Sequence, residues 1–81
     1  MYYKYRQTVL VELEKHGAKP SSDTPPELVH DFVTDLYRYE IRALKRELKQ
    51  GRIPQSCYAS RVDELRKRYP VLSLPLRFWI E

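Results

Sequence analysis

Apolar residues recur at helical spacing across residues 25–49, a segment with no glycine and no proline after its first two positions. Placed at about 100° per residue, its apolar side chains fill an arc of roughly 220°. A helix with one buried side needs an arc of little more than about 100°. The pattern therefore predicts one long helix, roughly 37 Å from end to end, that is covered on two sides. Its apolar positions are Leu28, Val29, Phe32, Val33, Leu36, Tyr37, Tyr39, Ile41, Ala43, Leu44 and Leu48.

The residues at both ends of this segment fit a helix. Asp23 and Thr24 offer side-chain oxygens that can cap the first turn. Pro25 and Pro26 are tolerated in that turn because their missing N–H groups are not needed there. Gly51 follows the last apolar position and predicts a left-handed stop. We expect the helix to begin at residue 25 and to end at residue 49.

Two shorter segments carry narrower apolar stripes. Residues 2–16 predict a first helix that Gly17 ends, and residues 55–69 predict a third helix that Pro70 ends. Residues 18–26 are rich in Pro and Ser and predict a loop. The short turn before the third helix predicts that it lies antiparallel to the long helix. The two stripes are Tyr2, Val9, Leu10 and Leu13, and then Tyr58, Val62, Leu65 and Tyr69.

The C-terminal residues 70–81 alternate in a period of two, which a helix does not produce. Pro75 excludes a central strand position, so we predict an extended arm. Two hypotheses stay open for its apolar edge. The arm either closes the core of its own chain, with Trp79 as a buried aromatic residue, or docks onto another subunit or partner. The apolar edge consists of Leu72, Leu74, Leu76, Phe78 and Ile80.

Length and composition indicate one small all-α domain over residues 1–81. With 42% hydrophobic and 32% charged residues, the composition is that of a soluble globular protein. Cys57 is the only cysteine, so no intramolecular disulfide can form and we expect a cytoplasmic location. The N-terminal segment is interrupted by Glu12 and Glu14 and has no small-residue cleavage site, so we expect neither a signal peptide nor a membrane span.

Charge is unevenly distributed along the chain. Residues 38–68 hold ten Lys and Arg against four acidic residues, a net charge of +6, whereas residues 1–37 hold four against six, a net charge of −2. On the long helix, four cations are spaced so that they stack on one face over roughly 16 Å. We call these four residues the basic ridge, and Arg52 in the following turn extends it. The basic ridge consists of Arg38, Arg42, Lys45 and Lys49.

Three interpretations of this charge distribution stay open. Acidic residues near the start of a helix and basic residues near its end complement the helix dipole and form an ordinary solvated face. A ridge of cations also neutralises phosphates, so it can bind nucleic acid in a salt-dependent way. Finally, two such helices set antiparallel bring each acidic half opposite the other's basic half, which would orient a homodimer.

Candidates for chemistry are few. Glu40 and Glu47 fall on the apolar arc, where a carboxylate needs a cation, and Arg6 is a candidate partner. We interpret these carboxylates as members of structural ion pairs rather than as a catalytic pair. Neither His16 nor His30 has a companion at metal-ligand spacing. We take Cys57 as a small, partly buried residue. The sequence therefore predicts no catalytic residue, no metal and no cofactor.

The function expected from the sequence is a non-catalytic protein–protein interaction module. It would self-associate as a homo-oligomer or serve as a small subunit of a larger assembly, with no membrane and no small-molecule substrate. Aromatic residues suit such interfaces because one end is apolar and the other can hydrogen-bond. The alternative is binding of an RNA or DNA backbone through the basic ridge and Arg52. The interface candidates are Leu74, Leu76, Phe78, Trp79 and Tyr37.

Overall fold

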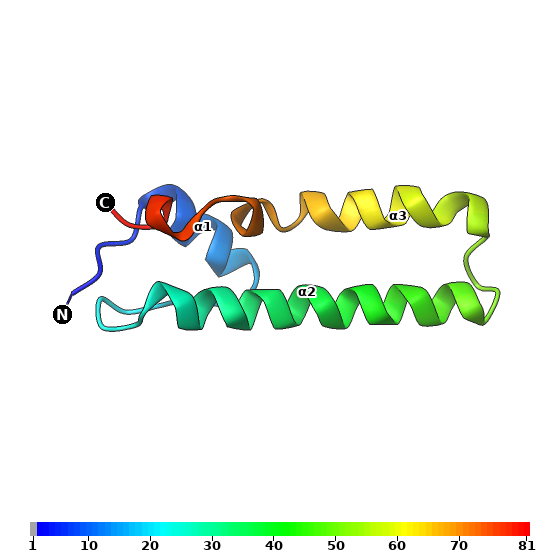
Figure 1. Cartoon of the computed structure of the whole chain (residues 1–81), viewed down its shortest axis with the longest axis horizontal. Coiled ribbons are helices and arrows are strands. Elements are labelled where there is room, and N and C mark those ends of the chain that lie inside the picture. Colours follow the sequence, from blue (N-terminus) through cyan, green and yellow to red (C-terminus); the bar gives the residue numbers. More distant parts are fainter. Residues whose placement is uncertain (1) are drawn as a thin grey trace.

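The computed structural model describes residues 2–81, which form a small all-α domain. Its three α-helices are α1 (Gln7–Lys15), α2 (Pro26–Lys49) and α3 (Gln55–Lys67). Two 3-10 turns follow, η1 (Pro70–Ser73) and η2 (Leu76–Phe78). The molecule is elongated, with extents of 49 × 17 × 16 Å, and α2 runs along its long axis (Figure 1).

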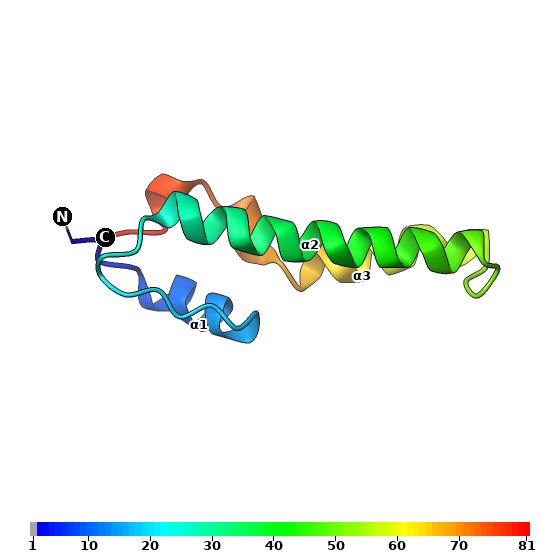
Figure 2. The same ribbon diagram turned by 90° about the horizontal axis from the view of Figure 1, so that it is seen from below.

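The two halves of α2 have different neighbours. The segment containing η1 and η2 lies along the N-terminal half of α2, and α3 returns along the C-terminal half in the opposite direction (Figure 1). Figure 2 shows that α1 also lies beside the N-terminal half. The N-terminal half therefore has neighbours on two sides, whereas the C-terminal half is one arm of a two-helix hairpin.

Glycine ends the first two helices, as the sequence predicts. Gly17 has φ of 79° and Gly51 has φ of 74°, in the left-handed region that favours glycine. At the end of α2, the Gly51 N–H donates to the Leu48 carbonyl and the Arg52 N–H donates to the Glu47 carbonyl. This pair of hydrogen bonds is a Schellman motif, which satisfies carbonyls that the helix leaves unpaired.

The prediction that Asp23 or Thr24 caps the first turn of α2 is wrong. Pro25 is the N-cap and no side chain caps the first turn, so the helix begins at Pro26. Thr24 instead closes its own turn, because its Oγ1 accepts a hydrogen bond of 3.1 Å from the Ser21 backbone N–H. The first helical position tolerates proline without a cap, since proline has no N–H to satisfy.

The predicted first helix is too long at its N-terminal end. Residues 2–6 are not helical because their backbone groups bond to distant segments. The Arg6 N–H donates to the Trp79 carbonyl at 2.9 Å, and the Glu81 N–H donates to the Lys4 carbonyl at 2.8 Å. Tyr2 does not belong to the apolar stripe of α1, since 81% of its surface is exposed. The two ends of the described chain are thus paired, and α1 starts only after the pairing.

The prediction of an extended arm over residues 70–81 is also wrong. Residues 70–73 and 76–78 form 3-10 turns, so alternate residues of this segment do not lie on two opposite faces as they would in an extended strand. Val71 and Trp79 are the buried residues of this segment, and neither belongs to the predicted apolar edge. Leu74 and Phe78, which do belong to it, are exposed. The first of the two hypotheses is nevertheless confirmed, because the segment packs on its own chain and buries Trp79.

The hydrophobic core lies where α1, the C-terminal segment and the N-terminal half of α2 meet. Trp79, Leu13 and Val33 are fully buried there. The Trp79 indole N–H donates to the Leu74 carbonyl at 3.1 Å, so its polar atom is satisfied. The buried members of the core are Tyr5, Val9, Leu13, Ala18, Val29, Val33, Leu65, Tyr69, Val71 and Trp79.

Replacement of Trp79 should nearly unfold the protein. Trp79→Ala removes a fully buried aromatic side chain and is expected to cost about 3–5 kcal/mol of unfolding free energy, much of the total of a small domain. Phe78→Ala is the matched control, because Phe78 is 40% exposed, and should cost only about 1 kcal/mol. Chemical denaturation followed by circular dichroism measures both. Equal losses in the two variants would contradict the assignment of Trp79 to the core.

Candidate interaction surfaces

The outward face of α2 carries large apolar side chains that the rest of residues 2–81 leaves about half exposed or more. Leu28 is 61% exposed, Phe32 is 48% exposed and Tyr39 is 65% exposed. They lie at one edge of the predicted apolar arc, and the opposite part of that arc holds the buried Val29 and Val33. We call Leu28, Phe32 and Tyr39 the apolar strip. The apolar arc of α2 is thus wider than the part that other segments pack against, and its exposed edge is a candidate interaction surface.

A shallow hollow continues the apolar strip at the N-terminal end of α2. Leu28 and Phe32 form one wall, and the loop between α1 and α2 forms the other. Ala18 and Pro20 are the apolar residues of this wall. The full set of lining residues is Ala18, Lys19, Pro20, Thr24, Leu28, Val29 and Phe32.

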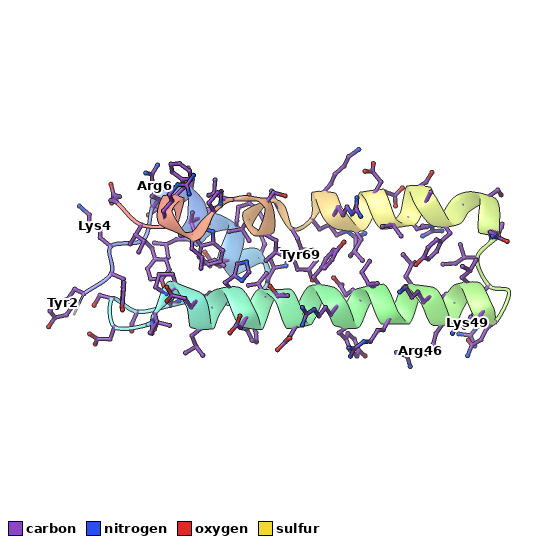
Figure 3. The ribbon with its side chains drawn as sticks, viewed as in Figure 1. Tyr2, Lys4, Arg6, Arg46, Lys49 and Tyr69 are labelled. Atoms are coloured by element: carbon purple, nitrogen blue, oxygen red, sulfur yellow. The ribbon has the colours of Figure 1, made fainter. Side chains whose placement is uncertain are left out.

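The basic ridge is exposed over its whole length. Within residues 2–81, none of its four side chains makes an ion pair. Arg52 differs, because its guanidinium lies 3.4 Å from the Glu47 carboxylate. Figure 3 shows Arg46 and Lys49 pointing away from α3, on the outer side of the hairpin. The outer face of the C-terminal half of α2 therefore presents uncompensated positive charge to solvent.

The other interface candidates differ in how far they are exposed. Trp79 is fully buried and offers no surface, so its assignment as a contact residue is wrong. Leu74 and Phe78 are exposed and Leu76 is half-buried. Phe78 already has a partner, since the Arg77 guanidinium lies 4.8 Å from the centre of its ring. Tyr37 is half-buried and packs edge-on against another ring of its own chain.

A cluster of polar and aromatic groups joins the three helices near the middle of the molecule. The ring of His16 stacks on Tyr69, with centroids 4.1 Å apart, and Tyr37 meets the same ring edge-on at 5.3 Å. His16 Nε2 lies 2.7 Å from the Arg68 carbonyl, and because a carbonyl only accepts, this nitrogen carries the proton. The Tyr69 hydroxyl donates to the Glu40 carboxylate. In Figure 3, Tyr69 points from the end of α3 towards α2.

This hydrogen bond explains how α2 tolerates Glu40 on its apolar arc. The Tyr69 hydroxyl supplies the partner that a half-buried carboxylate needs. Burial, and then the hydrogen bond to Glu40, raises the pKa of Tyr69 above its usual value of 10.0. Tyr69 therefore stays neutral at physiological pH. The polar groups of the cluster satisfy one another, and together they fix α1 and α3 against α2.

Of three other expectations for polar side chains, two are wrong and one is confirmed. Arg6 pairs with neither glutamate of α2, since its Nε donates to the Ile80 carbonyl at 3.3 Å. Glu47 does belong to an ion pair, as expected, and its cation is Arg52 of the following turn. Cys57 is exposed rather than partly buried. In each case the partner or the exposure depends on where the chain turns, which local spacing does not specify.

Comparisons with known protein families, curated proteins and solved structures find no match to this chain. Among residues 2–81, no group of three or more His, Cys, Asp or Glu side chains is placed to hold a metal ion. In the same part of the chain, no helix has both the length and the apolar content needed to cross a membrane.

The Tyr69 contact predicts a specific loss of stability at high pH. The unfolded chain releases the Tyr69 proton near pH 10, and the folded protein releases it only at higher pH. The stabilisation is therefore complete below about pH 10 and is lost as the pH rises further. Burial also raises the pKa of Tyr5, which adds to the same loss.

The measurement is the unfolding free energy at about pH 9 and about pH 11. Tyr69→Phe should be less stable than the wild type at the lower pH and should lose less stability between the two. Tyr2→Phe is the control, because Tyr2 is exposed, and it should follow the wild type. A steeper loss in Tyr69→Phe than in the wild type would contradict the role given to this hydroxyl.

Proposed function

We propose that this protein is a non-catalytic protein–protein interaction module that works by self-association through the outward face of α2. The observation that carries the proposal is the apolar strip. Three large apolar side chains lie along one helix face, each about half exposed or more. Such a strip costs solvation free energy in a monomer and marks a contact surface.

The size of the domain supports the same proposal. An 81-residue chain buries a smaller fraction of its surface than a larger protein does, and association adds to what it buries. Here α3 buries only Leu65 within its own length, so the hairpin half of the molecule has little core. A second molecule on the outward face of α2 would bury apolar surface that the monomer leaves exposed.

Removal of the apolar strip should abolish association. The wild type is expected to show a mass that rises from monomer towards dimer with concentration, measured by sedimentation velocity or light scattering. The variant Leu28→Ser, Phe32→Ser, Tyr39→Ser should stay monomeric with unchanged helix content, because all three side chains are exposed. Tyr2→Ser with Val11→Ser removes exposed apolar groups elsewhere and should associate as the wild type does. A wild type that is monomeric at every concentration would refute the proposal.

The basic ridge favours nucleic-acid backbone binding as a second candidate function. Its four cations are exposed and lack ion-pair partners within the described residues, so they are free to neutralise phosphates. Tyr39 lies on the same outward face, where its exposed ring can stack on an unpaired base. This combination suits a single strand better than a duplex groove.

Binding of this kind should depend on salt and on the ridge. A fluorescent single-stranded RNA should bind at low salt and be released as salt rises. Arg42→Glu with Lys45→Glu should abolish binding. Lys4→Glu with Lys19→Glu produces the same change of net charge away from the ridge and should weaken binding much less; Lys4 lies at the opposite end of the molecule (Figure 3). Equal effects of the two pairs would exclude the ridge as a specific site.

A further inference from the structure

The outward face of α2 has the spacing of a helix-pairing seam. Its exposed residues recur at intervals of four and three over three full heptads, a length of about 32 Å. Every member is exposed. We call this row the outward seam. It consists of Leu28, Phe32, Asp35, Tyr39, Arg42, Arg46 and Lys49.

The seam is not uniform along its length. Its first half holds Leu28, Phe32 and Asp35, with the exposed Asp31 beside it. Its second half holds only cations after Tyr39, namely Arg42, Arg46 and Lys49. Apolar and acidic groups thus occupy one half, and long basic side chains occupy the other.

Two copies can pair along this seam in parallel or antiparallel. A parallel pair sets Asp35 opposite Asp35, and then each cation of the second half opposite itself. Four of the seven layers would then bring like charges together, which opposes association. An antiparallel pair sets the apolar and acidic half of each copy opposite the basic half of the other, and no layer holds two like charges.

We propose that the partner of the outward seam is a second copy of this chain, bound antiparallel along nearly the full length of α2. This inference rests on the proposed self-association and adds its geometry. In this register, Leu28 lies opposite Arg46, Phe32 opposite Arg42, and Asp35 opposite Tyr39. The twofold axis passes between these layers, near the middle of α2.

Each of these layers is chemically complementary. The methylene groups of Arg46 cover Leu28, and the guanidinium of Arg42 stacks on the Phe32 ring. The Tyr39 hydroxyl reaches the Asp35 carboxylate as a hydrogen-bond donor. At the flank of the seam, Asp31 of one copy lies opposite Lys45 of the other, and Arg38 lies opposite its own symmetry mate near the axis, which is the one like-charge contact of this arrangement. Because the axis is twofold, each contact occurs twice.

Charge reversal tests the orientation. The double variant Asp31→Lys with Asp35→Lys leaves only basic charges in the outward seam and at its flank. The double variant Arg42→Glu with Lys45→Glu makes most of the charges at the flank and at the centre of the seam acidic. Each pair should weaken self-association about tenfold or more, since attractive contacts become repulsive at both symmetry-related sites. The fourfold variant that combines both pairs keeps the wild-type net charge and should recover part of the lost association, because it re-forms the opposite charges at positions 31 and 45 but not the Phe32–Arg42 and Asp35–Tyr39 contacts. All four positions are exposed, so helix content measured by circular dichroism should stay constant.

Crosslinking provides a second test in a Cys57→Ser background, which removes the exposed native thiol. Asp31→Cys and Lys45→Cys variants, when mixed, should be joined by a short bis-maleimide, and neither should crosslink alone. Crosslinking of each variant with itself would show a parallel pair and overturn the inference.

The two proposals fail in different ways. A wild type that associates, but whose association ignores both charge reversals, would overturn the antiparallel geometry and leave self-association standing. A wild type that never associates would overturn both. Loss of association in the reversed pairs with no recovery at all in the fourfold variant would also overturn the inference, because the matched charges at positions 31 and 45 would then contribute nothing to the interface.

Discussion

The burial of Trp79 is the interaction on which the rest of this structure depends. The indole packs near His30 of α2, and its N–H is satisfied within its own segment by the Leu74 carbonyl. Its backbone carbonyl accepts the hydrogen bond of Arg6, immediately before α1 begins. One residue near the C-terminus thus joins the start of the chain to the long helix. Without it, α1 would lose the segment that holds it against α2.

Because the core is built at this end, the long helix is covered unequally. The N-terminal half of α2 packs against the C-terminal segment and α1, and its inner side is buried. The C-terminal half has only α3, and the cluster around Tyr69 holds the two helices together where the core ends. Within residues 2–81, no helix covers the outer side of α2 in either half. An unequal distribution of neighbours around a wide apolar arc is what leaves the apolar strip exposed.

Local rules predict the three-helix, all-α fold well. The long helix ends at residue 49 as expected, because an unbroken period and a left-handed glycine are properties of neighbouring residues. The two chain ends are predicted poorly, because the bridge between Tyr5 and Ile80 joins residues 75 positions apart. The candidate surface is also hard to predict from the sequence, because the segment that covers part of α2 is far from it along the chain. Sequence spacing gives the width of the apolar arc, but the C-terminal segment decides which edge stays open, so the sequence alone does not single out Leu28 and Phe32 as candidate contact residues.

The order of charges on α2 needs more than the helix dipole to explain it. The dipole favours acidic residues at the start of a helix and basic residues at its end, but its effect falls off within the first and last turns. Asp35, Arg38 and Arg42 lie well inside α2, about two turns or more from either end. Charges at these positions gain little from the dipole, and a solvated face requires no particular order of sign. An ordered change of sign at the centre of a long exposed face does distinguish one orientation of a partner from the other, which is how we interpret it.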